Sequence, residues 1–410
     1  MEPDTRPLVA GDTISLSSSR SADIDLRKQN DSELDRKGDL TARGDSVRRK
    51  ERRFWIKASI IIISVLMIAV FLFCVLSGYY SCTKWEVLLV LAHGILDGVI
   101  WVLELPCLLF PDLAYTIGNP IPVTWSPNID LVVWDVRVIR IVAVIFIGGG
   151  LALSGASYQC LFRNPLVSES ILGVSNGACF GACLAILLML PTFFINVLAF
   201  IGGGLAVFLT YTCSKMLRGN QTLLLVLTGT VVSSIFSAGI SIIKYVAPTE
   251  TALPEITFWL MGSFAKITKG DLLYLIPIIT ICAVILIRMR WKMNVLALGD
   301  REARALGVSV GKTRAIIVVC STLIASVSVC VCGAIAWVGI IIPQIVRHMV
   351  GPDCRRLMPC AFFIGGIFLM LVDVACRATI AAELPVGVVT SLIGAPMFFM
   401  ILFRAKTAWA

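Results

Sequence analysis

Charged residues are scarce in this chain. Only 15% of its 410 residues are charged, whereas 58% are hydrophobic, and the mean hydropathy is +0.89. An ordinary soluble domain carries about 25% charged residues. Several apolar runs reach the roughly 20 residues that cross a bilayer as a helix. The composition excludes a soluble protein and predicts an all-α polytopic membrane protein.

Histidine is almost absent, and the cysteines are scattered. The chain has two histidines, His93 and His348, and its fourteen cysteines stand singly in apolar segments without a CxxC pair. Metal and redox sites are read from clusters of such residues. Neither a Ser/His/Asp set nor a pair of carboxylates is recognisable. We therefore predict no catalytic residue, no metal site and no cofactor, and we interpret the cysteines as buried small side chains.

Ionisable residues are also rare inside the apolar segments. An ion-coupled carrier normally places such groups near the bilayer midplane, where they are costly and therefore functional. Here Lys244 lies near the end of its segment, and Asp373 and Arg377 are spaced to pair with each other on one helix. The pattern argues against a self-powered secondary transporter, which stays as an alternative.

A nucleotide site within the chain is not predicted either. Residues 307–313, GVSVGKT, resemble a phosphate-binding loop, but such a loop has four residues between its glycines and follows a strand. This stretch has three and precedes an apolar span. Energy for transport must then come from another protein.

The first 53 residues differ from the rest. Eleven of the 26 acidic residues fall in this stretch, which has few large apolar side chains and is predicted to be a disordered tail. The basic cluster 48–53 places the N-terminus in the cytoplasm, with residues 54–410 forming a transmembrane domain in the plasma membrane. Because the net charge of +9 follows this topology, no nucleic-acid partner is predicted.

About ten segments have the length of a membrane span. They are 58–80, 139–162, 171–190, 193–214, 222–246, 272–287, 315–332, 334–350, 357–379 and 387–404. Residues 87–110 are apolar but interrupted by prolines, and we interpret them as surface-lying or partly re-entrant. Residues 254–266 are too short to span and are predicted to form a helix at the outer interface.

One charged stretch interrupts the apolar second half. Residues 288–314 contain seven basic and two acidic residues, and this surplus of positive charge marks a cytoplasmic loop. Within it we expect Asp300 to be the N-cap of a short helix that Gly307 ends. Such a helix would lie across the membrane surface, where another protein can bind it.

Three blocks resemble one family of membrane proteins. They are LALGDREARALGV from Leu296, LALSGASYQCLFRNPLVSESILGVSNGA at 151–178, and ELPVGVVTSLIGAP at 383–396. They are similar to the FecCD-type permeases, the membrane subunits of ABC importers for iron-siderophores, haem and cobalamin. One departure follows Arg163, where Ser168 and Glu169 replace the family's usual acidic residue and proline.

The resemblance implies a type II ABC importer permease architecture with several partners. A second permease subunit, in a homodimer or heterodimer, would complete the pathway. Two copies of an ATP-binding subunit would bind inside, and an extracytoplasmic substrate-binding protein would dock outside. ATP hydrolysis would reside in the partner subunit, so this chain would not be an enzyme.

The resemblance also implies functional residues. The helix that couples to the ATP-binding subunit would comprise Asp300, Arg301, Glu302, Ala303, Arg304, Leu306 and Gly307. We expect Ala303 and Leu306 to enter a groove on that subunit, with the charged residues at its rim. Binding-protein docking would use Arg137, Arg140 and Arg377 at the outer face. The inner gate would lie at Asn220, Gln221 and Thr222.

The substrate implied is an iron chelate, with haem or cobalamin as alternatives in the same family. Outside this family, a zinc or manganese permease is the nearest rival among ABC importers, but its blocks do not resemble these. A receptor or structural membrane protein is a further alternative, and it would bind no ATP-hydrolysing partner.

Overall fold

The computed structural model describes residues 61–78, 82–109, 118–379 and 383–408. The chain divides into two units, Met1–Ile62 and Ile63–Ala410. Of the first unit only Ile61 and Ile62 are described, and both are helical and exposed. The tail predicted for residues 1–53 lies outside the described residues. The following description concerns Ile63–Ala410.

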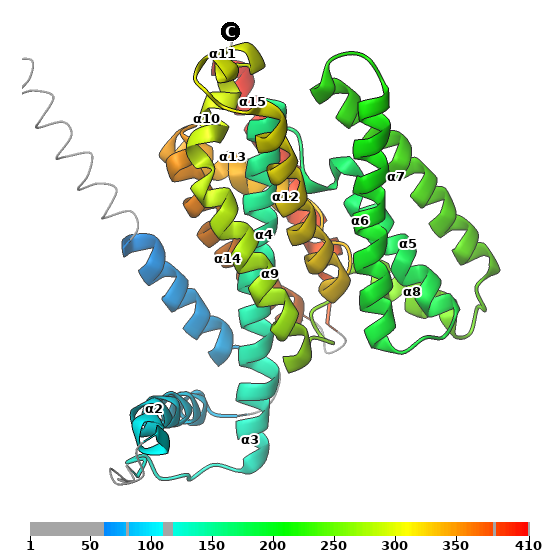
Figure 1. Ribbon diagram of the computed structural model, residues 1–410. Coiled ribbons are helices and arrows are strands. Elements are labelled where there is room, and N and C mark those ends of the chain that lie inside the picture. The colour runs from blue at the N-terminus through cyan, green and yellow to red at the C-terminus, as the bar shows by residue number, and fades with distance from the viewer. Residues whose placement is uncertain (1–60, 79–81, 110–117, 380–382, 409–410) are drawn as a thin grey trace, which may run out of the picture. The chain divides into compact units, whose positions relative to one another are not determined.

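All regular structure in the described part of the chain is helical (Figure 1). After a first helix, Ile61–Leu76, come α2 (Lys84–Leu109), α3 (Pro127–Leu131), η2 (Val132–Val138), α4 (Ile139–Phe162), η3 (Glu169–Leu172), α5 (Val174–Leu187), α6 (Thr192–Met216) and α7 (Gln221–Val246). Then follow α8 (Ala252–Met261), α9 (Lys269–Arg288), α10 (Arg290–Leu298), α11 (Asp300–Ala305), α12 (Val310–Cys332), α13 (Val338–Val350), α14 (Cys354–Thr379) and α15 (Val386–Ala408).

The helices agree with the predicted spans. In the described residues, 6 helices are long and apolar enough to cross a membrane, and shorter apolar helices lie at Ile61–Leu76, Val174–Leu187, Val338–Val350 and Val386–Ile401. Each of the ten predicted segments falls on one of these helices. The predicted all-α polytopic fold is confirmed.

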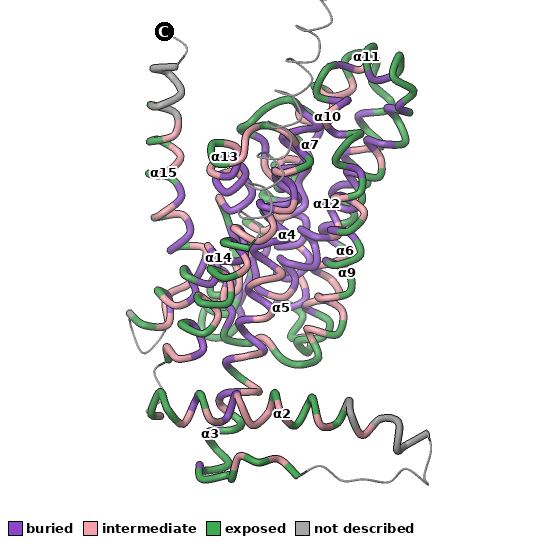
Figure 2. Tube along the Cα trace, turned by 90° about the vertical axis from the view of Figure 1, so that its left-hand side faces the viewer, coloured by how far each residue is buried: buried purple, intermediate pink, exposed green. Residues whose placement is uncertain are grey.

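Helix α4 forms the centre of the bundle. It packs against α9, α12, α13 and α14, and almost all of its residues are buried (Figures 1 and 2). Close packing depends on glycine, because a Cβ at Gly148 would overlap the carbonyl of Gly365 on α14, and one at Gly155 would overlap that of Gly339 on α13. In lipid there is no hydrophobic drive that brings helices together, so close packing of small residues stabilises these helix contacts instead.

Two segments differ from the helices of a simple up-and-down bundle. The predicted span 334–350 begins outside any helix, because α12 is followed by its C-cap Gly333 with φ 75°, and α13 starts only after Trp337, with φ 72°. Its 13 residues rise about 20 Å, less than the roughly 30 Å hydrocarbon core. Helix α2 runs across the direction of α4 in Figure 2, as expected of a surface-lying helix.

Candidate functional site: the coupling loop and its connections

Helix α11 begins differently from the prediction. Asp300 is its first residue, and Gly299 occupies the N-cap position with φ 142°, so the expectation that Asp300 is the N-cap is wrong. A side chain other than hydrogen is strained at this φ. The Asp300 carboxylate makes no capping bond and points instead to arginines from other elements.

The end of α11 follows the prediction. Gly307 has φ 78°, its N–H donates to the carbonyl of Arg304, and the Val308 N–H donates to the carbonyl of Ala303. This is the Schellman arrangement, in which an apolar contact joins the residue after the glycine to the last turn of the helix. Ala303 and Val308 are both buried, as such an apolar contact requires.

The burial of Ala303 corrects the predicted docking face. Its side chain packs within this chain and cannot enter a groove on another protein. Leu306, in contrast, is 55% exposed. The exposed surface of α11 therefore combines this leucine with Arg301, Glu302, Arg304 and Gly307.

Asp300 holds α11 to the ends of neighbouring helices. Its carboxylate lies 3.3 Å from the Arg163 guanidinium and 3.2 Å from that of Arg314. Arg163 ends α4 in the left-handed conformation, with φ 51°, and opens the hairpin of residues 163–168, in which the Asn164 side chain accepts a bond from the Leu166 N–H. The coupling helix is thus bonded to both α4 and α12.

Arg314 extends this connection to the gate candidates. Its Nη2 lies 3.4 Å from the Thr222 hydroxyl as well as bonding to Asp300. Asn220 is the N-cap of α7, with its side chain accepting from the Thr222 N–H at 3.0 Å, and Gln221 is the first helical residue. A polar helix start explains these three residues locally, and Arg314 additionally links them to α11.

The three arginines predicted for docking are not free at the surface. Arg137 and Arg140 are 4% and 5% exposed. Arg140 bonds both carboxylate oxygens of Glu383 at 2.9 Å and lies 2.8 Å from Asp373. Arg377 lies 3.0 Å from Asp373, which confirms their predicted pairing.

These arginines bind helix ends together. Arg137 donates to the carbonyl of Val75, and Arg377 donates to those of Cys74 and Ser77, all at the end of the first helix. Buried guanidinium groups with these partners cannot reach a docked protein in this conformation. Their placement contradicts the expected exposure and assigns them to joining the first helix, α4, α14 and the segment before α15.

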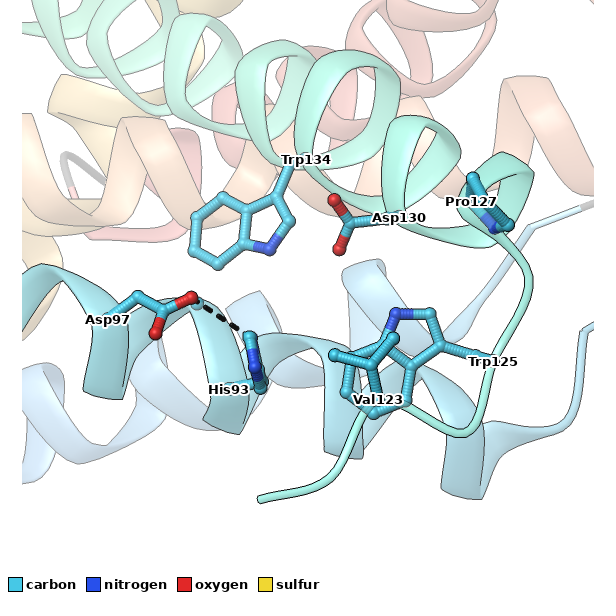
Figure 3. Close-up of a pocket in the computed structure, with 8 residues that line it drawn as sticks. His93, Asp97, Val123, Trp125, Pro127, Asp130 and Trp134 are labelled. Atoms are coloured by element: carbon cyan, nitrogen blue, oxygen red, sulfur yellow. Dashed lines mark ion pairs between the residues drawn. The ribbon is translucent and has the colours of Figure 1, made fainter. Parts of the chain in front are cut away.

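A cavity of about 500 Å³ lies between α2 and the start of the long helix that contains α4 (Figure 3). Trp125, Trp134 and Asp130 face it from one side, and His93 with Asp97 faces it from α2, where their side chains lie 3.1 Å apart. The His93 and Trp125 rings meet edge to face. No cluster of three or more His, Cys, Asp or Glu side chains suited to a metal occurs among the described residues.

Several buried polar residues escaped the sequence analysis. Gln159 and Gln344 bond Arg347 on α13, and Gln344 also donates to the carbonyl of Pro165 in the hairpin, so they connect α4, α13 and the hairpin. A glutamine in an apolar segment is the sequence feature that could have identified them, because a buried amide needs hydrogen-bond partners. The partners of Asp300 carried no comparable signal, since Arg163 and Arg314 resembled ordinary inner-loop cations.

Comparisons with known proteins find similar membrane permeases. The FecCD transport family model matches residues 66–404. The chain is 38% identical to the molybdate import permease MolB of Haemophilus influenzae, over 67% of this chain and 82% of MolB. It is 36% identical to the vitamin B12 import permease BtuC of Yersinia pestis, over 70% and 86% of the two chains. A permease assigned to iron chelatin transport in Helicobacter pylori is 33% identical, over 68% and 84%.

A solved structure supports the same fold. It shows an inward-facing conformation of a transporter assigned to the metal-chelate ABC type. With 34% sequence identity and a TM-score of 0.65, it covers 75% of this chain and 99% of its own.

Proposed function

Because this chain belongs to the FecCD transport family, we propose that it forms, with a second permease subunit, the pathway through which an ABC importer carries an iron chelate. A permease of this family is a multi-pass membrane protein that acts with an ATP-hydrolysing subunit and a substrate-binding protein, and it is not itself catalytic. The iron chelate, the dimer and a cytoplasmic N-terminus in the plasma membrane are the finer parts of the proposal.

The coupling loop is the observation that carries the proposal. Its helix is fixed at both ends by backbone geometry, yet exposes a leucine and several charges. An apolar residue surrounded by charges is typical of a docking surface. The basic surplus of residues 288–314 supports placing this surface in the cytoplasm, where ATP-hydrolysing subunits bind.

The contacts of Arg314 suggest how docking reaches the pathway. A movement of α11 displaces Asp300, and the charge-assisted bond to Arg314 transmits that displacement to Thr222 at the start of α7. In this proposal, ATP binding and hydrolysis in the partner subunits shift α11, and the gate at Asn220, Gln221 and Thr222 responds.

The proposed substrate is supported by relatives named for iron chelatin and for metal chelates. Molybdate is a second candidate, because the identity of 38% to a molybdate permease exceeds the 33% to the iron chelatin permease. Cobalamin stays an alternative through the 36% identity to the vitamin B12 permease.

Uptake by reconstituted vesicles tests the proposal. The permease, its ATP-binding subunit and its binding protein are placed in vesicles loaded with ATP, and entry of radiolabelled ferric siderophore, molybdate and cobalamin is measured separately. We expect uptake of the ferric siderophore that requires ATP and is insensitive to ionophores. Uptake of molybdate or cobalamin alone would refute the iron assignment, and ATP-independent, ionophore-sensitive uptake would refute ABC import.

A further inference from the structure

Two cysteine thiols meet at the cytoplasmic end of the bundle. Cys160 lies in the last turn of α4, Cys354 is the first residue of α14, and their sulfur atoms are 2.9 Å apart. A disulfide bond is about 2.05 Å long. The two sulfur atoms are therefore about 1 Å from bonding distance, although 194 residues separate them in the chain.

The pair sits beside the base of the coupling loop. The Asn294 side chain of α10 accepts a bond from the Cys354 N–H at 2.8 Å and donates to the Asp353 carboxylate at 2.6 Å. Helix α10 packs on both α4 and α14. The positive charge of Arg347 acts on both thiols and favours the thiolate form, whereas the Asp353 carboxylate opposes it at Cys354.

We propose that Cys160 and Cys354 form a reversible thiol–disulfide site whose oxidant is hydrogen peroxide. Cys160, the more exposed thiol at 8%, attacks the peroxide oxygen and becomes a sulfenic acid while one water leaves. The Cys354 sulfur then attacks the Cys160 sulfur, forming the disulfide and releasing a second water. Two thiols and one hydrogen peroxide thus give one disulfide and two waters, and a dithiol reductant restores the thiols.

The disulfide would restrict movement where the coupling loop meets the bundle. It joins α4 to α14 covalently, and α10 is attached to the same point through Asn294. Arg163 at the end of α4 is also a partner of Asp300 on α11. The consequence for transport rests on the proposed function, whereas formation of the disulfide does not.

Peptide mapping tests the bond itself. The purified transporter is treated with hydrogen peroxide, unreacted thiols are alkylated under denaturing conditions, and the chain is digested with trypsin without reduction. Cleavage after Arg140, Arg163, Arg347 and Arg355 places the two cysteines in peptides 141–163 and 348–355. We expect these peptides to be linked after oxidation and separate after reduction, with the chain still migrating as a monomer.

Cys360 provides the matched control. It lies on α14, is also 8% exposed, and trypsin separates it from Cys354 at Arg355 and Arg356. We expect it to remain alkylatable at peroxide concentrations that link the pair. Full alkylation of Cys160 and Cys354 in the oxidised sample, or oxidation of Cys360 to the same extent, would overturn the assigned site.

Transport measurements test the regulatory consequence. Peroxide should lower substrate-stimulated ATP hydrolysis severalfold in the wild type, and reduction should restore it. Cys160→Ser and Cys354→Ser should be insensitive, whereas Cys360→Ser should respond as the wild type does. A linked protein with undiminished ATP hydrolysis would refute the regulation, and a reduced protein with no substrate-stimulated hydrolysis would count against the proposed function instead.

Discussion

Glu169 is a buried acid without a cationic partner in the described part of the chain. It is 4% exposed, its Oε2 accepts no hydrogen bond from the described residues, and its carboxyl fills the space that Gly339 leaves open. Its charge acts on Tyr158 of α4. Burial raises the pKa of the Glu169 carboxyl from 4.5 to about 7. This residue stands where the sequence departs from the family pattern after Arg163.

Stability should therefore depend on pH in a defined direction. The unfolded chain loses the Glu169 proton near pH 4.5, whereas the folded chain keeps it to about pH 7. The folded state thus binds more protons between these values, so stability falls as pH rises through this window. Thermal unfolding in detergent at pH 5 to 8 should show this slope, and Glu169→Gln should flatten it. An unchanged slope in Glu169→Gln would assign the pH dependence to another group.

The Arg140 cluster allows a contrast between buried and exposed ion pairs. Removing one partner of a buried pair commonly costs about 3–5 kcal/mol, because the other charge is left unpaired. Arg140→Met should therefore strongly lower the unfolding temperature, since Asp373 is only 1% exposed.

The control is Lys269→Met. Lys269 bonds Asp135 with side chains that are 68% and 38% exposed, and exposed pairs contribute about 0–1 kcal/mol. Equal losses of stability in the two variants would refute the structural role of Arg140. Because Arg137 and Arg140 are buried, charge reversal at these residues should destabilise the fold. A loss of binding-protein docking in such a variant would then follow from the loss of folding.

At the scale of elements, substitutions in helix α11 can distinguish a role in docking from a role in folding. Leu306→Asp should leave the loop folded, because this side chain is largely exposed, but it should abolish substrate-stimulated ATP hydrolysis. Truncating a central interface residue costs more than about 1–2 kcal/mol of binding, and a charge in an apolar groove costs more still.

Ala303→Arg is the informative comparison for Leu306→Asp. It forces a long cation into the Schellman contact with Val308 and should lower the unfolding temperature as well as the activity. If Ala303→Arg is as stable as the wild type, or Leu306→Asp hydrolyses ATP normally, the assignment of the exposed and buried faces of α11 is incorrect.

The sequence predicted where the helices lie, but it did not predict which of their side chains are buried. Apolar length located the six long apolar helices and the four shorter ones of the described residues, and Gly307 located the end of α11, because bilayer thickness and backbone sterics act locally. The burial of Ala303 and Arg140 depends on contacts with Val308, Asp373 and Glu383. Arg140 and Glu383 are 243 residues apart, and no local pattern reveals such a pairing.

Across the bundle, the ion pairs of the described residues gather at its two ends. Near α11, Asp300 joins Arg163 and Arg314, and at the other end Arg140 and Asp373 join helix ends, with α4 reaching both (Figure 1). This arrangement suits a membrane domain, because a buried charge within the hydrocarbon region is costly.

The N-terminal tail should be dispensable for transport. Its composition cannot support a packed core, so deletion of residues 1–45 should preserve membrane insertion and uptake at equal expression. The matched variant keeps the tail and replaces the basic residues of 48–53 with glutamine, which removes the positive charge that we propose retains the N-terminus in the cytoplasm. That variant should expose the N-terminus to external protease and lose uptake, because the first helix would insert in the wrong direction. Loss of uptake in the deletion variant, with normal insertion, would demonstrate a function of the tail itself.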